Sequence, residues 1–255
     1  MKTTRKGIET LLRMPVSEFE KFHAKTKILK PVRNINQKFW PKEWIEVFYK
    51  AYSRFEEIKL PKPTLSSGIG LKNALEERHS TRKFSDKSIS SAKLSSLLYF
   101  SAGKSPNKKG FAERRFYPSG GGRYPLEVYI ISQNTDIKKG IFHYYVNNNS
   151  LERLADYKKK DLNKIINLKW VNKAGCIIII TAIFKRHTVK YGNRGYRNIL
   201  VEAGHMAQNF YVIANALNLG ICGVGGYLDD QVNALLDVNG VDESVVYLLA
   251  VGERG

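Results

Sequence analysis

The stretch that decides the fold is GCIIIITAIF, residues 175–184. It is a run of β-branched residues in which apolar and polar positions do not alternate. A strand of this kind is buried on both faces, because a strand with one wet face alternates polar and apolar side chains. The run therefore predicts a central strand that is covered on both sides by other elements.

Apolar patterns on either side of this run predict further strands and helices. The predicted strands are 126–132, 141–146 and 245–251, and the predicted helices are 71–78, 91–102, 196–219 and 229–238. Gly220 follows the longest helix at the position where helices commonly end on glycine. Helices and strands mix without regular βαβ alternation, which indicates an α+β fold.

The predicted helix 196–219 carries apolar side chains around much of its circumference. These side chains are Ile199, Leu200, Met206, Phe210, Val212, Ile213 and Leu217. A helix that is apolar on more than one face is buried inside a domain or between two subunits. The pattern by itself fits both arrangements.

Residues 1–70 form a basic and aromatic N-terminal segment ahead of the main domain, residues 71–255. Weak helical patterns cover 16–24 and 41–55 in this segment. Prolines, serines and a glycine around 61–68 then indicate a linker.

The composition indicates an ordinary globular protein with an excess of positive charge. The 255 residues include 42 Lys and Arg against 23 Asp and Glu, a net charge of +19. The basic residues are spread along the chain and no nucleic-acid-binding motif accompanies them, so we expect no nucleic-acid partner. The longest apolar run is too short to cross a bilayer, and the N-terminus lacks the apolar core of a signal peptide. Two isolated cysteines, Cys176 and Cys222, fit reduced thiols in a cytoplasmic protein.

Residues 78–82, RHSTR, close a predicted helix with two guanidinium groups and a hydroxyl. Arg can hold a phosphate through bidentate, charge-assisted hydrogen bonds, and Ser adds a neutral donor. The simpler interpretation is a basic helix end that offsets the helix dipole. Taken alone, the cluster favours the simpler interpretation.

Residues 118–125, PSGGGRYP, form a glycine loop whose two ends are stiffened by proline. Three successive glycines carry no Cβ, so the backbone can lie against a flat ligand. The loop is neither a Walker A loop, because no GK[ST] follows, nor a dinucleotide fingerprint, because it precedes a strand. A second glycine cluster, CGVGGY at 222–227, could present backbone N–H groups in the same way or could be a plain turn.

Residues 190–197, KYGNRGYR, place Lys190 beside Tyr191. An ammonium group near a phenol can lower the pKa of the phenol toward that of a useful base. Neighbouring side chains on a strand point to opposite faces, so both reach one site only from a turn or loop, which Gly192 and Gly195 favour. The alternative is a basic surface loop.

Two other chemistries are disfavoured. Glu202 and His205 have the i, i+3 spacing of a di-iron ligand pair, but the predicted strands argue against the helix bundle that such a site requires. A hydrolase would show a G-x-S-x-G elbow or a reactive Cys–His pair, and the sequence offers neither. We expect no metal site, and a structural or hydrogen-bonding role for His205.

Taken in order, these clusters resemble the motifs of the nitroreductase superfamily of FMN-dependent oxidoreductases, and more narrowly those of its SagB-type dehydrogenases. The similarity covers most of the chain. The similar segments are RHSTRKF at 78–84, PSGGGRYPLE at 118–127, GIFHY at 140–144, EAGHMAQN at 202–209, GVGG at 223–226, AVGER at 250–254 and FHAKTK at 22–27.

The resemblance implies a nitroreductase-like fold with a central mixed or antiparallel sheet flanked by helices. It also implies an FMN held at a homodimer interface, beside a long buried helix. The implied FMN-binding residues are Arg78, His79, Ser80, Arg82, Pro118, Ser119, Gly120, Gly121, Arg123, Val224, Gly225, Gly226 and Arg254. His79 is a departure, since many members of the family have a second Arg there.

The resemblance further implies a reaction. Lys190 and Tyr191 match a Lys–Tyr pair that supplies the base in azoline dehydrogenases, which oxidise thiazoline or oxazoline rings of ribosomal peptides to azoles. The expected partners are a second copy of the chain, a peptide or carrier-bound azoline substrate, and a cyclodehydratase complex. Two alternatives stay open: a general NAD(P)H-dependent nitro or quinone reductase, and a catalytically inactive flavin-fold binding partner of a peptide-modifying complex.

Overall fold

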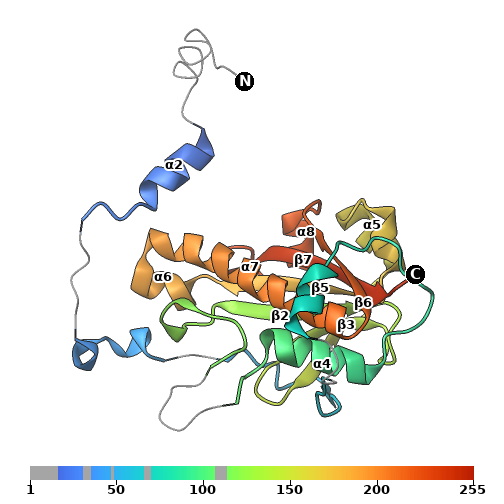
Figure 1. The fold of residues 1–255 in the computed structure, drawn as a ribbon. Coiled ribbons are helices and arrows are strands. Elements are labelled where there is room, and N and C mark those ends of the chain that lie inside the picture. Colours follow the sequence, from blue (N-terminus) through green and yellow to red (C-terminus); the bar gives the residue numbers. More distant parts are fainter. Residues whose placement is uncertain (1–16, 31–35, 47–48, 66–69, 107–113) are drawn as a thin grey trace, which may run out of the picture.

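The fold is a seven-stranded sheet with helices on both faces (Figure 1). The computed structural model describes residues 17–30, 36–46, 49–65, 70–106 and 114–255. Within these ranges the strand order is β1-β4-β3-β2-β5-β7-β6, and every neighbouring pair is antiparallel. The strands are β1 Glu57–Lys59, β2 Leu126–Ser132, β3 Gly140–Tyr145, β4 Ser150–Ala155, β5 Cys176–Ile183, β6 Leu219–Val224 and β7 Glu243–Glu253. The α+β prediction is confirmed.

Helices pack on both faces of this sheet (Figure 1). The α-helices are α2 Glu18–Lys25, α3 Leu71–Glu76, α4 Ser91–Ala102, α5 Lys159–Ile165, α6 Lys185–Tyr191, α7 Asn193–Ala216 and α8 Asp229–Leu235. α4 has the predicted bounds, and Ser90 caps it by accepting a hydrogen bond from the backbone N–H of Lys93. α2 begins with a capping box formed by Ser17 and Glu20, and it stands away from the sheet (Figure 1).

β5 is covered on both faces, as its sequence predicts. Ile178 and Ile180 belong to the hydrophobic core that includes α4 and α7. Ile177 and Ile179 belong to the second core, which includes α5 and α8. Each of the four side chains is at most 1% exposed. Figure 1 shows α4 and α5 on opposite sides of the sheet.

The helix predicted at 41–55 is wrong. The described part of that range holds a short 3-10 helix, Lys42–Trp44, and residues 47–48 lie outside the described residues. The described aromatic side chains Trp44 and Tyr52 face different parts of the domain instead of one common face. Trp44 lies near Lys190, whereas Tyr52 packs edge-on against the ring of His143. The segment follows the domain surface because its anchoring contacts are spread over it.

α7 is the long predicted helix, shifted toward the N-terminus. It begins after Gly192, whose φ is +52°, and ends at Ala216. The predicted glycine end is wrong, because Asn218 takes the left-handed backbone with φ of +55° and Gly220 lies inside β6. Gly220 is required there for a close approach, since a Cβ would lie 2.6 Å from the Cγ2 atom of Thr81.

Different faces of α7 have different environments. Ile199, Met206 and Phe210 are fully buried against the sheet and α4. Leu200 and Val201 are 41% and 53% exposed. The helix therefore supplies core on one face and an apolar surface on another.

Two remaining expectations concern the cysteines and the membrane. Cys176 and Cys222 are buried and form no disulfide, and burial raises the pKa of Cys176 to about 12. In the part of the chain that the structure describes, no helix is both long and apolar enough to span a bilayer. The N-terminal residues examined for a signal sequence, 1–16, lie outside the described residues. The domain division at residue 70 stays a prediction.

Candidate functional site

Lys190 and Tyr191 lie at the end of α6, against the glycine loop. The predicted loop around them is wrong: α6 extends to Tyr191, and Gly192 separates it from α7. A Cβ on Gly121 would lie 2.5 Å from Tyr191 Oη and 3.2 Å from Lys190 Nζ. Gly121 also has φ of +64°, a conformation that glycine adopts without strain. Two successive helical residues thus reach one point because the loop presses against the helix end.

Glu202 and His187 lie directly behind this loop. The backbone N–H of Gly120 donates to Glu202 Oε1 at 2.9 Å. His187 Nδ1 lies 3.7 Å from the same oxygen, and the His187 ring lies 4.7 Å from that of Tyr191. Within the described residues, neither His187 Nδ1 nor Glu202 Oε2 has a hydrogen-bond partner, although the side chains are 0% and 4% exposed. The loop is therefore backed by two buried titratable groups.

The sequence reasoning did not select these two residues for the site. Glu202 was considered as half of a metal pair with His205, but Glu202 is buried and His205 is exposed. His187 was not singled out. Its position four residues before Tyr191 on one helix was the available signal, because residues at i and i+4 share a helix face.

Burial shifts the pKa of all four groups. It raises the pKa of Glu202 to about 7, against the opposing effect of the Gly120 N–H. Burial, together with the positive charges of Arg123 and Lys190, lowers the pKa of His187 to about 4. Burial and Arg123 also lower the pKa of Lys190. The expected lowering of the Tyr191 pKa is wrong, because burial and the Glu202 charge raise it more than Arg123 lowers it.

Arg123 connects the glycine loop to two other segments. Its Nε donates to the carbonyl of Arg186 at 2.7 Å, and its Nη1 donates to the carbonyl of Glu46 at 2.8 Å. The side chain is buried, and its positive charge lowers the pKa of both Lys190 and Tyr191. Whether Arg123 also binds FMN stays a prediction.

Pro118 and Ser119 begin the same loop. Ser119 Oγ accepts a hydrogen bond from the backbone N–H of Tyr124 at 2.9 Å, which closes the loop on itself. Ser119 Oγ also lowers the pKa of Glu202, against the larger effect of burial. The loop is thus held in place by its own residues and by α7.

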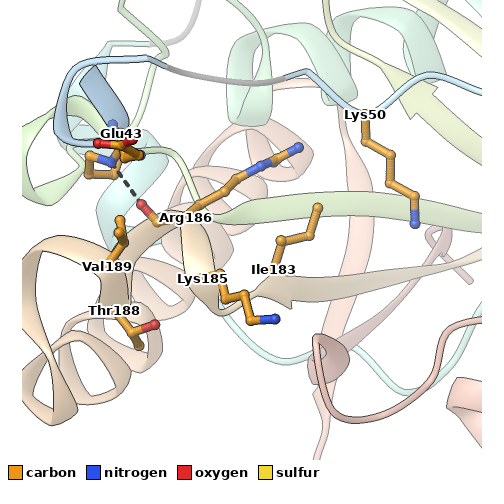
Figure 2. Close-up of a pocket in the computed structure, with 8 residues that line it drawn as sticks. Glu43, Lys50, Ile183, Lys185, Arg186, Thr188 and Val189 are labelled. Carbon is orange, nitrogen blue, oxygen red and sulfur yellow. Dashed lines mark hydrogen bonds between the residues drawn. The ribbon is translucent and has the colours of Figure 1, made fainter. Parts of the chain in front are cut away.

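A pocket of about 670 Å³ opens beside the first part of α6 (Figure 2). It is lined by Glu43, Lys50, Arg123, Ile183, Lys185, Arg186, Thr188 and Val189. Three of its cations are already paired, since Lys50 contacts Glu243, Lys185 contacts Asp242 and Arg186 contacts Glu127. Lys190 and Tyr191 do not line it, so this pocket is not where the candidate catalytic groups meet.

The predicted phosphate cluster lies along β6. Thr81 donates its backbone N–H to the carbonyl of Ile221 at 2.8 Å. The Arg78 guanidinium lies 5.8 Å from the centre of the Tyr211 ring, and Tyr211 Oη accepts the backbone N–H of Gly223 at 2.6 Å. Residues 78–82 and the second glycine cluster therefore lie side by side.

The second glycine cluster is mostly strand. Residues 222–224 belong to β6, which the sequence reasoning missed because glycines at 220 and 223 resemble a turn. Val224 is buried and pairs with Leu248 of β7, so its predicted contact with FMN stays a prediction. Gly225 and Gly226 follow the strand, and a Cβ on either would meet no atom within 4 Å. Open backbone of this kind leaves room for a flat ring.

The charged groups beside this open backbone suit a phosphate. Among the residues that the structure describes, neither Arg78 nor Arg82 contacts a carboxylate, and both are exposed. Ser80 is exposed between them, while His79 Nδ1 lies 2.8 Å from the carbonyl of Glu77. Arg254 hydrogen-bonds Asn215 Oδ1 and, at 3.4 Å, the carbonyl of Leu219. The donor set fits the phosphate and flat ring of FMN.

The site residues thus fall into two groups that meet different parts of α7. The glycine-loop region comprises Gly120, Gly121, His187, Lys190, Tyr191 and Glu202. The basic region comprises residues 78–82, residues 223–226 and Arg254. The first contacts α7 at Glu202 and the second at Tyr211 and Asn215. Nine residues from 202 to 211 correspond to about 14 Å of helix, so the two regions meet α7 at different turns.

Comparison with known proteins places this architecture in a family. Residues 75–253 match the model of the nitroreductase family. The chain is 30% identical over 201 residues to MJ1384 of Methanocaldococcus jannaschii, a protein named for the same family, with 78% of this chain and 96% of that protein covered. The chain belongs to the nitroreductase family of oxidoreductases.

A second relative comes from peptide processing. The chain is 29% identical over 190 residues to the microcin B17-processing protein McbC of Escherichia coli, covering 70% of this chain and 69% of that protein.

Solved structures with less than 25% identity share the fold. The chain aligns with a nitroreductase from Anabaena variabilis at a TM-score of 0.71 and 22% identity, over 92% of this chain and 47% of that one. It aligns with a chain of the E. coli microcin synthetase McbBCD complex at a TM-score of 0.61 and 22% identity, over the whole of both chains. A nitroreductase from Desulfovibrio desulfuricans in complex with FMN aligns at 0.52 and 19%, over 74% of this chain and 88% of that one.

Proposed function

We propose that this protein is an FMN-dependent dehydrogenase of the SagB type that oxidises thiazoline or oxazoline rings of a peptide or carrier-bound substrate to azoles. The observation that carries the proposal is the meeting of Lys190 Nζ and Tyr191 Oη at Gly121. The similarity to McbC, named as a microcin-processing protein, supports a peptide substrate.

The reaction requires a base because the ring must lose a proton as well as a hydride. The proton leaves the ring carbon next to the carbonyl, which is the acidic one. Tyr191 is partly buried and its raised pKa keeps it a phenol, whereas the pKa of Lys190 is lowered by burial and by Arg123, which eases loss of its proton. Tyr191 would contact the substrate carbon, accept its proton and pass its own hydroxyl proton to Lys190. This relay replaces the expected scheme, in which an ammonium group stabilises a phenolate.

The basic region would hold the cofactor. Arg78, Ser80 and Arg82 would bind its phosphate and ribityl oxygens, with Arg254 close by. Gly225 and Gly226 offer open backbone to its flat ring. Bound FMN supplies a two-electron acceptor whose electrons pass on to molecular oxygen.

We propose a homodimer built on the exposed face of α7. Tyr196, Leu200 and Val201 are 39%, 41% and 53% exposed and form an apolar stripe at the outer side of that helix. Pairing two such stripes would bury them. We further propose that this pairing brings the basic region of one subunit to the glycine-loop region of the other. A cyclodehydratase complex remains the proposed further partner.

The experiment offers wild type and Tyr191→Phe two sets of reagents: a thiazoline peptide with oxygen, and a nitroaromatic with NADPH. We expect Tyr191→Phe to keep its FMN content and to lose azole formation by about 10²–10⁴-fold, since a positioned base contributes that much. Lys190→Ala should act in the same direction. Fast NADPH-driven turnover that ignores the substitution, with no azole formed, would establish the reductase instead. Absence of both activities in a flavin-loaded protein would favour an inactive binding partner.

A further inference from the structure

Two tryptophans from the N-terminal segment lie around Lys190. Lys190 Nζ lies 3.4 Å from the centre of the Trp40 ring and 5.8 Å from that of Trp44. The two indoles contact each other edge to face, with ring centres 6.2 Å apart. Both are partly buried and partly exposed. These residues lie about 150 positions before Lys190 in the sequence, and the sequence reasoning gave them no role.

Of the three described aromatic rings near Lys190 Nζ, that of Trp40 is the nearest, at 3.4 Å against 5.5 Å for Tyr191 and 5.8 Å for Trp44. Among the described residues Lys190 makes no ion pair, and the charged group that acts on it, Arg123, is repulsive. His187 and Tyr191 on the same helix are the titratable groups that face it. An ammonium over an indole face is attracted by the ring quadrupole. The ring therefore fixes where Lys190 Nζ lies and opposes the effects that lower its pKa.

The tryptophans are also tied to the glycine loop. The carbonyl of Glu46, two residues after Trp44, accepts a hydrogen bond from Arg123 Nη1 at 2.8 Å. Arg123 follows Gly121, the residue against which Lys190 and Tyr191 pack. The indoles, the loop and the end of α6 thus form one assembly.

We propose that Trp40 is a positioning residue for Lys190, and that Trp40 and Trp44 form the wall against which the flat heterocycle of the substrate lies. The proposal rests on the proposed function for its substrate. An azoline or azole is a flat five-membered ring, and offset or edge-on packing on an indole face suits it. The wall stands beside the proton acceptor, so a ring packed on it lies within reach of the Lys190–Tyr191 pair.

The positioning role is tested without substrate. Acetic anhydride labels neutral lysine amines, and mass spectrometry of Lys190 across pH reports its titration. In Trp40→Leu we expect the Lys190 titration to move to lower pH, because the ring no longer favours the ammonium. Trp40→Phe should restore much of the wild-type titration. Phe39→Leu is the matched control, since Phe39 is the 77% exposed neighbour of Trp40.

Unchanged Lys190 labelling in Trp40→Leu, in a protein with wild-type circular dichroism, would overturn the positioning role. The same result in Trp40→Leu and Phe39→Leu would also overturn it, because a general loosening of the segment would then explain both.

The substrate wall is tested by binding. A thiazole-containing peptide should quench tryptophan fluorescence in wild type, and Trp40→Phe and Trp44→Phe should each reduce the quench. Trp40→Leu and Trp44→Leu should raise KM for the thiazoline peptide by about 2- to 12-fold, the equivalent of one aromatic contact. A quench that survives in both Phe variants would overturn the wall. If wild type forms no azole, the proposed function is refuted, whereas the Lys190 labelling result still tests the positioning role.

Discussion

The basic region and the glycine-loop region meet the same helix but differ in exposure and in electrostatics. Arg78 and Arg82 are exposed and, within the described residues, face no carboxylate. Glu202 and His187 are buried, close to each other, and shifted in pKa in opposite directions. The difference supports the proposal that the exposed basic region binds an anion and that the buried glycine-loop region controls a proton. Substitutions in the first should change affinity, and substitutions in the second should change stability and rate.

The largest effect is expected in the basic region. The double variant Arg78→Ala/Arg82→Ala removes two charge-assisted contacts, each worth about 1.5–3 kcal/mol, so FMN affinity should fall by about 10²–10⁴-fold. The fold should be unchanged because both side chains are exposed. Titration of the apoprotein with FMN measures the affinity, and Lys83→Ala, an exposed cation in the same segment, is the control. Equal affinities in the double variant and the control would remove the basic region from the account.

The second prediction concerns Glu202 and the dependence of stability on pH. The carboxyl titrates near 4.5 when unfolded and near 7 when folded, so the folded state holds a proton that the unfolded state has released. Stability from this group is therefore full below about pH 4.5 and is lost as pH rises to about 7, by up to about 3 kcal/mol. Glu202→Gln should lack this loss.

His187 gives the opposite slope over an overlapping range. Its pKa falls from 6.5 unfolded to about 4 folded, so its contribution is lost as pH falls from 6.5 toward 4. In Glu202→Gln the stability should therefore rise with pH up to about 6.5, whereas in wild type the two effects partly cancel. Urea denaturation of both proteins at several pH values measures the free energy of unfolding against pH. Parallel curves for the two proteins would show that Glu202 ionises normally.

The smallest effect separates two neighbouring glycines. Gly121 and Gly122 have φ of +64° and +65°, but only a Cβ on Gly121 would meet other atoms, at Tyr191 and Lys190. Gly122→Ala should cost about 1–2 kcal/mol for the left-handed backbone alone. Gly121→Ala should cost about 1–3 kcal/mol more, because Tyr191 must move. Denaturation curves give both costs, and similar values would show that the loop does not press on α6.

Local pattern was sufficient for the parts of the fold that are buried uniformly. β5 and β2 are buried along nearly their whole length, and their largely apolar sequences predict that, although β2 also buries Glu127. α4 was predictable from its apolar spacing and its serine cap. β6 was missed because Gly220 and Gly223 are there for close contacts with Thr81 and Tyr247, which local sequence does not reveal.

The candidate site was predictable only where its chemistry lies in contiguous residues. Lys190 is next to Tyr191 in the sequence, and the three glycines of the loop are next to one another. Glu202 joins the loop through a hydrogen bond that spans 82 residues. Trp40 reaches Lys190 from the other end of the chain. Such contacts are set by the tertiary fold, so no local pattern carried them.

The most direct test of the central claim is complementation between the two regions. One subunit carries Arg78→Ala/Arg82→Ala and the other carries Tyr191→Phe, and the two are mixed, unfolded and refolded together with FMN. If the basic region of one subunit serves the glycine-loop region of the other, random pairing leaves about one quarter of all sites intact. Azole formation should then recover to about one quarter of wild type, against almost none for either variant alone. Activity of the mixture no greater than the sum of the two variants would contradict the account, because both regions of a site would then come from one chain.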